Sequence, residues 1–308
     1  MAAISFFVPF IISFLVFYIW HIMGVTVGYH RLLSHRSFRC PKFVEYFWVL
    51  GGYLAFEGSP IWWASIHRAH HRYTDTPLDP HSPRESWFAS YIGWTTKGKY
   101  ADHIRPQDAK DLCKDPIYQF LEQGGSWEKA HLLCAAIGTV FRLGLLACFG
   151  WPIALGCTAA GLFCLNVPLM LNLFCHIPKL GYKNFETKDD SVNVWWVAAL
   201  TMGEGWHNNH HAFPGSARSG FKRNEIDPSW ETIKLMKKVG LVSWFNEANP
   251  DSKAPAKVKP TLAPVAARTL TAVPSTHEDG TTKEQSEAKP RGRKIRQRKV
   301  REAVGARR

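Results

Sequence analysis

The sequence lacks the cysteine spacings that hold an iron–sulfur cluster or a structural zinc. Its seven cysteines include no pair at C-x-x-C spacing, and four of them lie inside apolar runs. We interpret them as reduced, packed thiols of an intracellular or membrane setting. The sequence also contains no flavin-type G-x-G-x-x-G segment and no haem-binding H-P-G-G segment. It therefore shows no electron carrier of its own.

Acidic residues are outnumbered by basic ones, and the excess of positive charge is concentrated at one end of the chain. The net charge is +13, and residues 251–308 alone hold 15 Lys and Arg against 6 Asp and Glu. We expect residues 246–308 to form a basic, disordered tail, because this composition buries too little apolar surface to fold. The tail is suited to anionic lipid, and a nucleic-acid partner is not expected. Residues 1–245 are expected to form the folded domain.

Three apolar runs are long enough to cross a bilayer. Residues 4–29 contain no charged side chain, and Arg142 is the only charge within residues 132–151 and 153–175. About 20 helical residues span a hydrocarbon core of ~30 Å. The connection Gly150-Trp151-Pro152 predicts a helical hairpin between the last two runs. A signal peptide is the alternative for the first run, but the basic segment that precedes such peptides is missing.

Residues 43–64 are apolar but carry two Glu, three Gly and a Pro. This pattern favours a re-entrant or interfacial segment over a spanning helix. Residues 228–239 predict an amphipathic helix. The Lys and Arg after the first and third runs place both segments on the cytoplasmic side. We therefore expect an all-α integral membrane protein, with about three spans plus the interfacial segment and a cytosolic helical cap.

Eight of the 14 histidines fall in three compact clusters. Residues 30–35 read HRLLSH, residues 67–71 read HRAHH and residues 207–211 read HNNHH. The repeated H-x-x-H-H spacing is improbable by chance at this histidine frequency. On a helix, residues at i, i+3 and i+4 share one face, so the three histidines of each H-x-x-H-H box are able to converge. His30 and His35 lie about 140° apart on an α-helix and are expected to flank two ions.

This number of imidazoles exceeds the needs of one metal, so two metals are the economical interpretation. Imidazole suits Fe, Zn, Cu and Ni, and the ligands alone do not separate these metals. All three boxes follow or precede apolar runs in a way that brings them to one side of the membrane.

These motifs resemble the membrane fatty acyl desaturase family, particularly its Δ9 branch. The similar stretches are HRLLSH within residues 28–38, HRAHH with Asp75 and Asp79-Pro80-His81 after it, and HNNHH within residues 203–214. The resemblance covers about residues 20–245. It implies insertion of a cis double bond into the acyl chain of a lipid or acyl-CoA, with O₂ and two Fe²⁺ in a cytosolic cap.

The resemblance also implies roles for individual residues. Asn172 and His176 match the family's N-x3-H element, in which the Asn approaches a metal through water. The implied iron ligands are His30, His35, His67, His70, His71, His176, His207, His210 and His211. Asp75, Asp79 and Glu204 are adjacent carboxylates that we expect to orient ligating imidazoles. Trp62, Trp63, Trp195 and Trp196 are candidates for lining an acyl tunnel or a membrane interface.

Three features depart from the family pattern. The chain has room for one span before the first box, where the family has two. It has Ser65-Ile66 where the acyl-CoA branch has Arg-Asp, which favours acyl chains carried on lipids. It has Tyr91 where the family often has His.

The chemistry agrees with a redox metal pair. Acyl methylenes are neither acidic nor electrophilic, so a strong oxidant is needed, and zinc has no redox chemistry. Since the sequence shows no electron carrier, an external donor is implied, such as cytochrome b5 or a ferredoxin with its reductase. The alternatives are a related di-iron hydroxylase or ketolase, a histidine-rich metal transporter and a bis-histidine membrane cytochrome. Transporter sites lie at the bilayer midplane and haem ligands lie within spans, unlike these boxes.

Overall fold

A computed structural model describes residues 2–95, 101–249 and 251. The described chain is mostly helical, with a single two-stranded antiparallel sheet. The predicted tail lies outside the described residues from 252 onward. In chain order the elements are α1 (Ala2–Met23), η1 (Gly24–Ser34), β1 (Phe38–Arg39), α2 (Lys42–Leu54), α3 (Pro60–Tyr73), η2 (Ala89–Gly93), η4 (Pro106–Ala109), η5 (Leu112–Lys114), α4 (Pro116–Glu122), η6 (Gln123–Gly125), α5 (Trp127–Phe149), α6 (Trp151–Phe174), η7 (Pro178–Leu180), α7 (Trp195–Leu200), α8 (His207–Ala212), α9 (Pro228–Lys238) and β2 (Trp244–Phe245).

The three predicted spans are confirmed as long apolar helices. Within the described part of the chain, three helical stretches are long and apolar enough to cross a membrane, at Ser5–Ser34, Trp127–Phe149 and Trp151–Phe174. The predicted hairpin is also confirmed, because α5 ends at Phe149 and α6 begins at Trp151. Gly150 joins them with a φ of 82°, a conformation that glycine adopts without strain.

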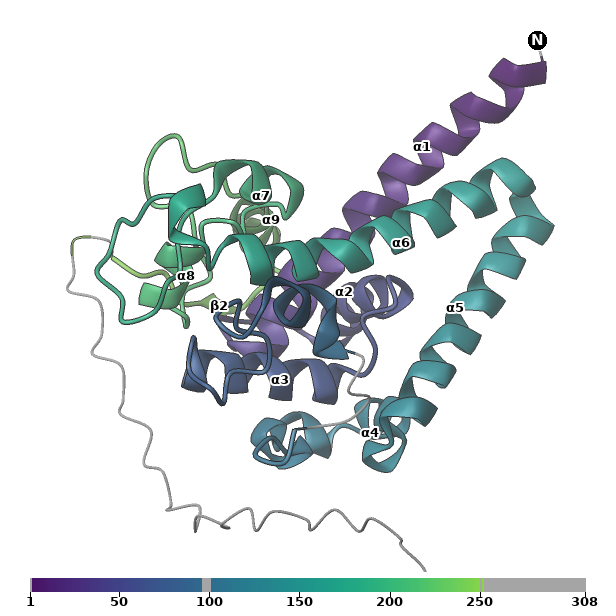
Figure 1. The fold of residues 1–308 in the computed structure, drawn as a ribbon. Coiled ribbons are helices and arrows are strands. Elements are labelled where there is room, and N and C mark those ends of the chain that lie inside the picture. Colours follow the sequence, from purple (N-terminus) through teal and green to yellow (C-terminus); the bar gives the residue numbers. More distant parts are fainter. Residues whose placement is uncertain (1, 96–100, 250, 252–308) are drawn as a thin grey trace, which may run out of the picture. The chain divides into compact units, whose positions relative to one another are not determined.

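Helices α1 and α6 lie side by side (Figure 1). Close approach depends on Gly156, because a Cβ there would lie 2.6 Å from the carbonyl oxygen of Phe10. Ser13 adds a polar link by donating to the carbonyl of Ile153 at 2.8 Å. Small residues and hydroxyl bonds of this kind are the usual means of joining helices where water is absent.

Helix α1 continues into η1, which is a π-helix of 11 residues. Its hydrogen bonds join residues five apart instead of four, which widens the turn. Gly24 begins η1 where it meets α2, and a Cβ at Gly24 would lie 2.2 Å from the nitrogen of Gly52. The close crossing of η1 and α2 therefore requires glycine at this point.

The length of α2 agrees with the prediction that residues 43–64 form no spanning helix. Its 13 residues extend about 20 Å at 1.5 Å per residue, too short to span ~30 Å. One face of α2 exposes Phe43 and Phe47, while Val49 and Tyr53 are buried on the other. The chain then turns into α3, whose first residues are capped by the Ser59 side chain accepting from the nitrogen of Ile61.

The predicted amphipathic helix is confirmed as α9, which begins after Asp227. The Asp227 carboxylate caps it by accepting from the nitrogen of Trp230 at 2.9 Å. After α9 comes β2, which pairs with β1, the strand that follows η1. In this pairing Phe38 lies opposite Phe245. This pairing fastens the segment after the last histidine box to the segment after the first.

Candidate metal centre

The structure brings all nine sequence-predicted histidines together in two groups. Within each group the ring nitrogens lie within 4.8 Å of one another. Eight of the nine come from residues in or directly after three helical elements, η1, α3 and α8, and His176 follows the end of α6. The first group is His30, His35, His67, His71 and His210, and the second is His70, His176, His207 and His211.

The expectation that His30 and His35 flank two ions is wrong, because both belong to the first group. The α-helical geometry behind that expectation does not apply here. Residues 24–34 form a π-helix, and the nitrogen of His35 donates to the carbonyl of His30, five residues earlier, at 3.1 Å. The wider turn brings residues five apart onto one face.

The expectation that each H-x-x-H-H box converges on one ion is also corrected. On α3, His67 and His71 join the first group, whereas His70 joins the second. On α8, the i and i+4 histidines 207 and 211 lie in the second group and His210 in the first. Residues at i and i+4 lie nearly above one another, but i+3 is displaced around the helix. Each box therefore contributes to both groups.

The Nε2 atoms turn inward within each group. In the first group, Nε2 of His35 lies 2.8 Å from that of His67, and Nε2 of His30 lies 3.1 Å from that of His210. In the second group, Nε2 of His176 lies 3.1 Å from that of His207. Crowded nitrogens of this kind present lone pairs to a shared centre.

Burial keeps most of these rings neutral. Removal from water, followed by the charge of neighbouring imidazoles, lowers the pKa of each of six histidines, and that of His211 falls to about 3 even beside a carboxylate. Only neutral imidazole offers a lone pair to a metal. The six are His35, His67, His71, His207, His210 and His211. His70 differs: burial acts against its charged form, but the Asp79 carboxylate outweighs this and raises its pKa.

Each of the three predicted carboxylates faces the Nδ1 of a different histidine. Asp79 lies 3.0 Å from His70 and Asp75 lies 3.1 Å from His176. An Oε2 of Glu204 lies 2.9 Å from Nδ1 of His30. A carboxylate at Nδ1 favours the tautomer whose Nε2 carries the lone pair.

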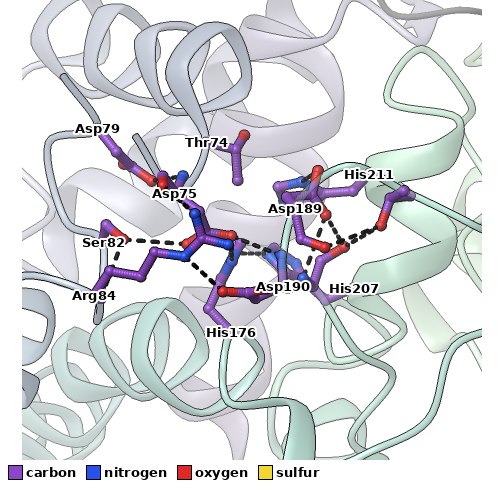
Figure 2. A network of polar contacts seen from close by, with 12 residues as sticks. Thr74, Asp75, Asp79, Ser82, Arg84, His176, Asp189, Asp190, His207 and His211 are labelled. Atoms are coloured by element: carbon purple, nitrogen blue, oxygen red, sulfur yellow. Dashed lines mark hydrogen bonds and ion pairs between the residues drawn. The ribbon is translucent and has the colours of Figure 1, made fainter. Parts of the chain in front are cut away.

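Sequence reasoning missed a fourth carboxylate, Asp189. Its Oδ2 lies 3.3 Å from Nδ1 of His211, and Figure 2 shows this pair in the same polar network as Asp75 and His176. Asp189 belongs to no histidine box and lies in a loop 22 residues before His211. Its neighbour Asp190 instead pairs with the exposed Arg84 (Figure 2).

Arg31 of the first box was also missed. It is 1% exposed, and its Nε donates to Glu204 at 2.8 Å. Its two terminal nitrogens donate to the Asp227 carboxylate at 3.1 and 2.9 Å. A planar guanidinium is able to hold two carboxylates at once. Arg31 thereby fixes Glu204 against His30 and joins η1 to the start of α9.

An apolar cavity of about 470 Å³ adjoins both groups. His30 and His67 of the first group and His207 of the second line it. Trp62, Trp63 and Asn172 also line it, whereas Trp195 is 70% exposed and Trp196 packs against Phe174. The side chains of two predicted tryptophans therefore face the cavity, and the other two lie elsewhere in the described structure.

The donor set fits two transition-metal ions. Five nitrogens meet in one group and four in the other, and each group includes imidazoles that burial keeps neutral. A third group consists of His70, Asp79 and His81. His70 already belongs to the second group, and Asp79 is the carboxylate that faces it. His81 stacks on His70 with ring centroids 4.3 Å apart, so it lies beside the second group.

A sequence model of the family described as "Fatty acid desaturase" matches residues 5–223. The chain belongs to the fatty acid desaturase family. It is thus an oxidoreductase that acts on fatty acyl chains, and with its long apolar helices it is a membrane protein. Membership of this family replaces the interpretations of the chain as a metal transporter or a membrane cytochrome.

Several desaturases are similar over most of their length. The chain is 39% identical to an "sn-1 stearoyl-lipid 9-desaturase" of Anabaena variabilis over 235 residues, covering 75% of this chain and 82% of the relative. It is 40% identical to "Acyl-CoA 5-desaturase AL21" of Anemone leveillei, covering 77% and 69%. It is 37% identical to "Delta-9 acyl-lipid desaturase 1" of Arabidopsis thaliana, covering 72% and 70%.

Proposed function

We propose that this protein inserts a cis double bond at the Δ9 position of a fatty acyl chain, using O₂ and two irons held by the nine histidines. The observation that carries the proposal is the contact between two buried histidine groups and one apolar cavity. The names of the stearoyl-lipid and acyl-lipid relatives support the Δ9 position and the acyl substrate.

The first group of five histidines would hold one iron and the second group of four the other. A pair of redox-active irons supplies the oxidising power that removal of hydrogen from an unactivated methylene requires. Asn172 lies on α6 at the cavity wall, in keeping with a contact to an iron through water. Asp75, Asp79, Asp189 and Glu204 would orient ligand imidazoles from behind.

The protein's own residues would bind the chain and exclude water. Trp62, Trp63 and Ile66 present an apolar wall beside His67, so an extended acyl chain lies against the histidines without competing hydrogen bonds. Thr26, Glu57 and Thr201 are among the polar residues that also line the cavity. Such a cavity favours a hydrocarbon chain, because the apolar surface of the chain is removed from water when it binds.

Electrons would come from outside the chain. A cytochrome b5 or a ferredoxin with its reductase fits, because the sequence shows no electron carrier of its own. The active site would face the cytoplasm, since the Lys- and Arg-rich segments adjoin the spans on that side.

The test is expression in a host of known fatty-acid profile, with double-bond positions mapped by mass spectrometry. We expect new Δ9 unsaturated chains with the wild type and none with His70→Ala. A hydroxylated product would identify a hydroxylase instead. Identical lipid profiles for the wild type and His70→Ala would refute the proposal.

A further inference from the structure

The apolar cavity reaches the outer surface between three helical elements. Ile92 of η2 and Leu162 of α6 both line the cavity, yet they are 37% and 51% exposed. Ala135 of α5 also lines the cavity and is exposed. A side chain that lines the cavity and is also exposed on the protein surface lies at an opening of the cavity. All three of these side chains are apolar. We call the gap bounded by Ile92, Ala135 and Leu162 the side opening.

The side opening faces the lipid side of the protein. Two of its three edges belong to α5 and α6, which are long and apolar enough to span a membrane. The third edge, η2, directly follows Trp87 and Phe88, which are 67% and 69% exposed. Exposed aromatic residues beside spanning helices are typical of the membrane–water interface.

The described lining of the cavity offers no lysine or arginine to a phosphorylated soluble carrier such as coenzyme A. Ser65 and Ile66, which precede the second histidine box, are 0% and 6% exposed and present no charge. A charged carrier would lose its hydration here without gaining a partner.

Tyr91 and Asn166 hold the rim of the side opening together. The Tyr91 hydroxyl donates to Oδ1 of Asn166 on α6 at 2.8 Å. Nδ2 of the same amide donates to the carbonyl of Leu162, which is itself an edge of the opening. Polar groups that lie among lipid chains need partners, and Tyr91 and Asn166 supply one to each other. It fixes the distance between η2 and α6, and it accounts for Tyr91, whose role the sequence left open.

We propose that the side opening admits the acyl chain of a membrane glycerolipid directly from the bilayer, with Tyr91 and Asn166 setting its width. The proposal rests on the desaturase function and narrows its substrate to acyl chains still attached to lipid. The headgroup stays at the interface while the chain passes between η2 and α6 to the histidines.

Leu162→Trp tests the opening, and Leu155→Trp is its matched control. Leu155 lies two helical turns earlier on α6, is 41% exposed, and is not among the described residues that line the cavity. Iron-loaded protein in lipid nanodiscs would receive a reductase and donor. It would be given either distearoyl phosphatidylglycerol in the disc or stearoyl-CoA in solution. Desaturated product would be measured by mass spectrometry.

We expect the wild type to desaturate the disc lipid and to leave stearoyl-CoA largely unused. Leu162→Trp should lower lipid turnover at least tenfold, while Leu155→Trp retains it. Iron content and melting temperature should be the same in all variants, which separates a blocked opening from a damaged fold. Tyr91→Phe should lower lipid turnover severalfold without loss of iron.

Two results overturn the side opening while the desaturase function stands. One is a wild type that converts stearoyl-CoA and leaves the disc lipid unchanged. The other is equal lipid turnover by Leu162→Trp and Leu155→Trp. If the wild type makes no double bond on either substrate, the desaturase function fails and the inference fails with it.

Discussion

Asp189 faces His211 across a loop, with Oδ2 of the aspartate 3.3 Å from Nδ1 of the imidazole. Ser191 donates its hydroxyl to the other carboxylate oxygen at 2.5 Å, so the carboxylate is held from both sides. This arrangement leaves Nε2 of His211 toward the second histidine group, where it lies 3.4 Å from Nε2 of His70. The ring of His211 therefore depends on a residue outside all three boxes.

Asp189→Asn should weaken metal binding with little change in fold. The amide has the same shape but removes the negative charge that supports His211, and loss of such a partner typically costs about 10–100-fold in affinity. The measurement is iron retained against a competing chelator.

Asp190→Asn is the control, because Asp190 pairs at the surface with Arg84, which is mostly exposed. Exposed pairs contribute at most about 1 kcal/mol, so iron affinity should stay close to that of the wild type. Equal iron retention by the two variants would contradict the role assigned to Asp189.

Glu57 should make the protein less stable as pH rises. Burial raises the pKa of this carboxyl from 4.5 to about 8, although the bond from Trp63 Nε1 acts the other way. Between these values the folded protein keeps a proton that the unfolded chain has lost. Folding stability therefore declines across pH 4.5 to 8.

Glu57→Gln removes this dependence while preserving the size of the side chain. Melting temperatures of the two proteins in detergent should differ little near pH 5, and the variant should be the more stable by the largest margin near pH 9. If the difference in melting temperature between the wild type and Glu57→Gln is the same at every pH in this range, Glu57 does not titrate as described.

Gly24→Ala should disrupt the first histidine group. The new Cβ would lie 2.2 Å from the nitrogen of Gly52 and 2.6 Å from the carbonyl oxygen of Trp48, both backbone atoms that cannot move freely. Overpacking of this kind costs about 1–3 kcal/mol or more, and here it displaces the start of the π-helix that carries His30. Lower melting temperature and reduced iron content are expected.

Gly144→Ala is the matched change in a membrane helix. A Cβ at Gly144 meets no described atom within 4 Å, and alanine favours helix over glycine by about 1 kcal/mol. This variant should be as stable as the wild type or more so. Comparable losses in both variants would mean that the crossing of η1 and α2 is not the cause.

Much of the fold could be predicted because apolar length and charge placement act locally. The runs that became α1, α5 and α6 needed only hydropathy and a Gly-Trp-Pro connection. The prediction that residues 43–64 form no spanning helix followed from their Glu, Gly and Pro residues, which a spanning helix would rarely carry. The π-helical turns of η1 could not be predicted, because they depend on packing against α2, which no local pattern near residues 24–34 reports.

The site was predictable in its members but not in its arrangement. The repeated spacing identified the histidines of α3 and α8, but an α-helical face alone did not show that His70 separates from His67. Asp189 and Arg31 carry no spacing signal, since their partners come from distant segments. The place of Arg31 inside a histidine box is visible in the sequence, but its burial, which requires a carboxylate partner, is seen only in the structure.

Iron content of purified wild type, His35→Ala and His176→Ala tests the central claim most directly. His35 belongs to the first group and His176 to the second, so each change removes an imidazole from one group only. The account predicts about two irons per wild-type chain, and loss of iron with loss of double-bond formation in both variants. A wild type that holds one zinc, or variants that keep both irons and full activity, would contradict it.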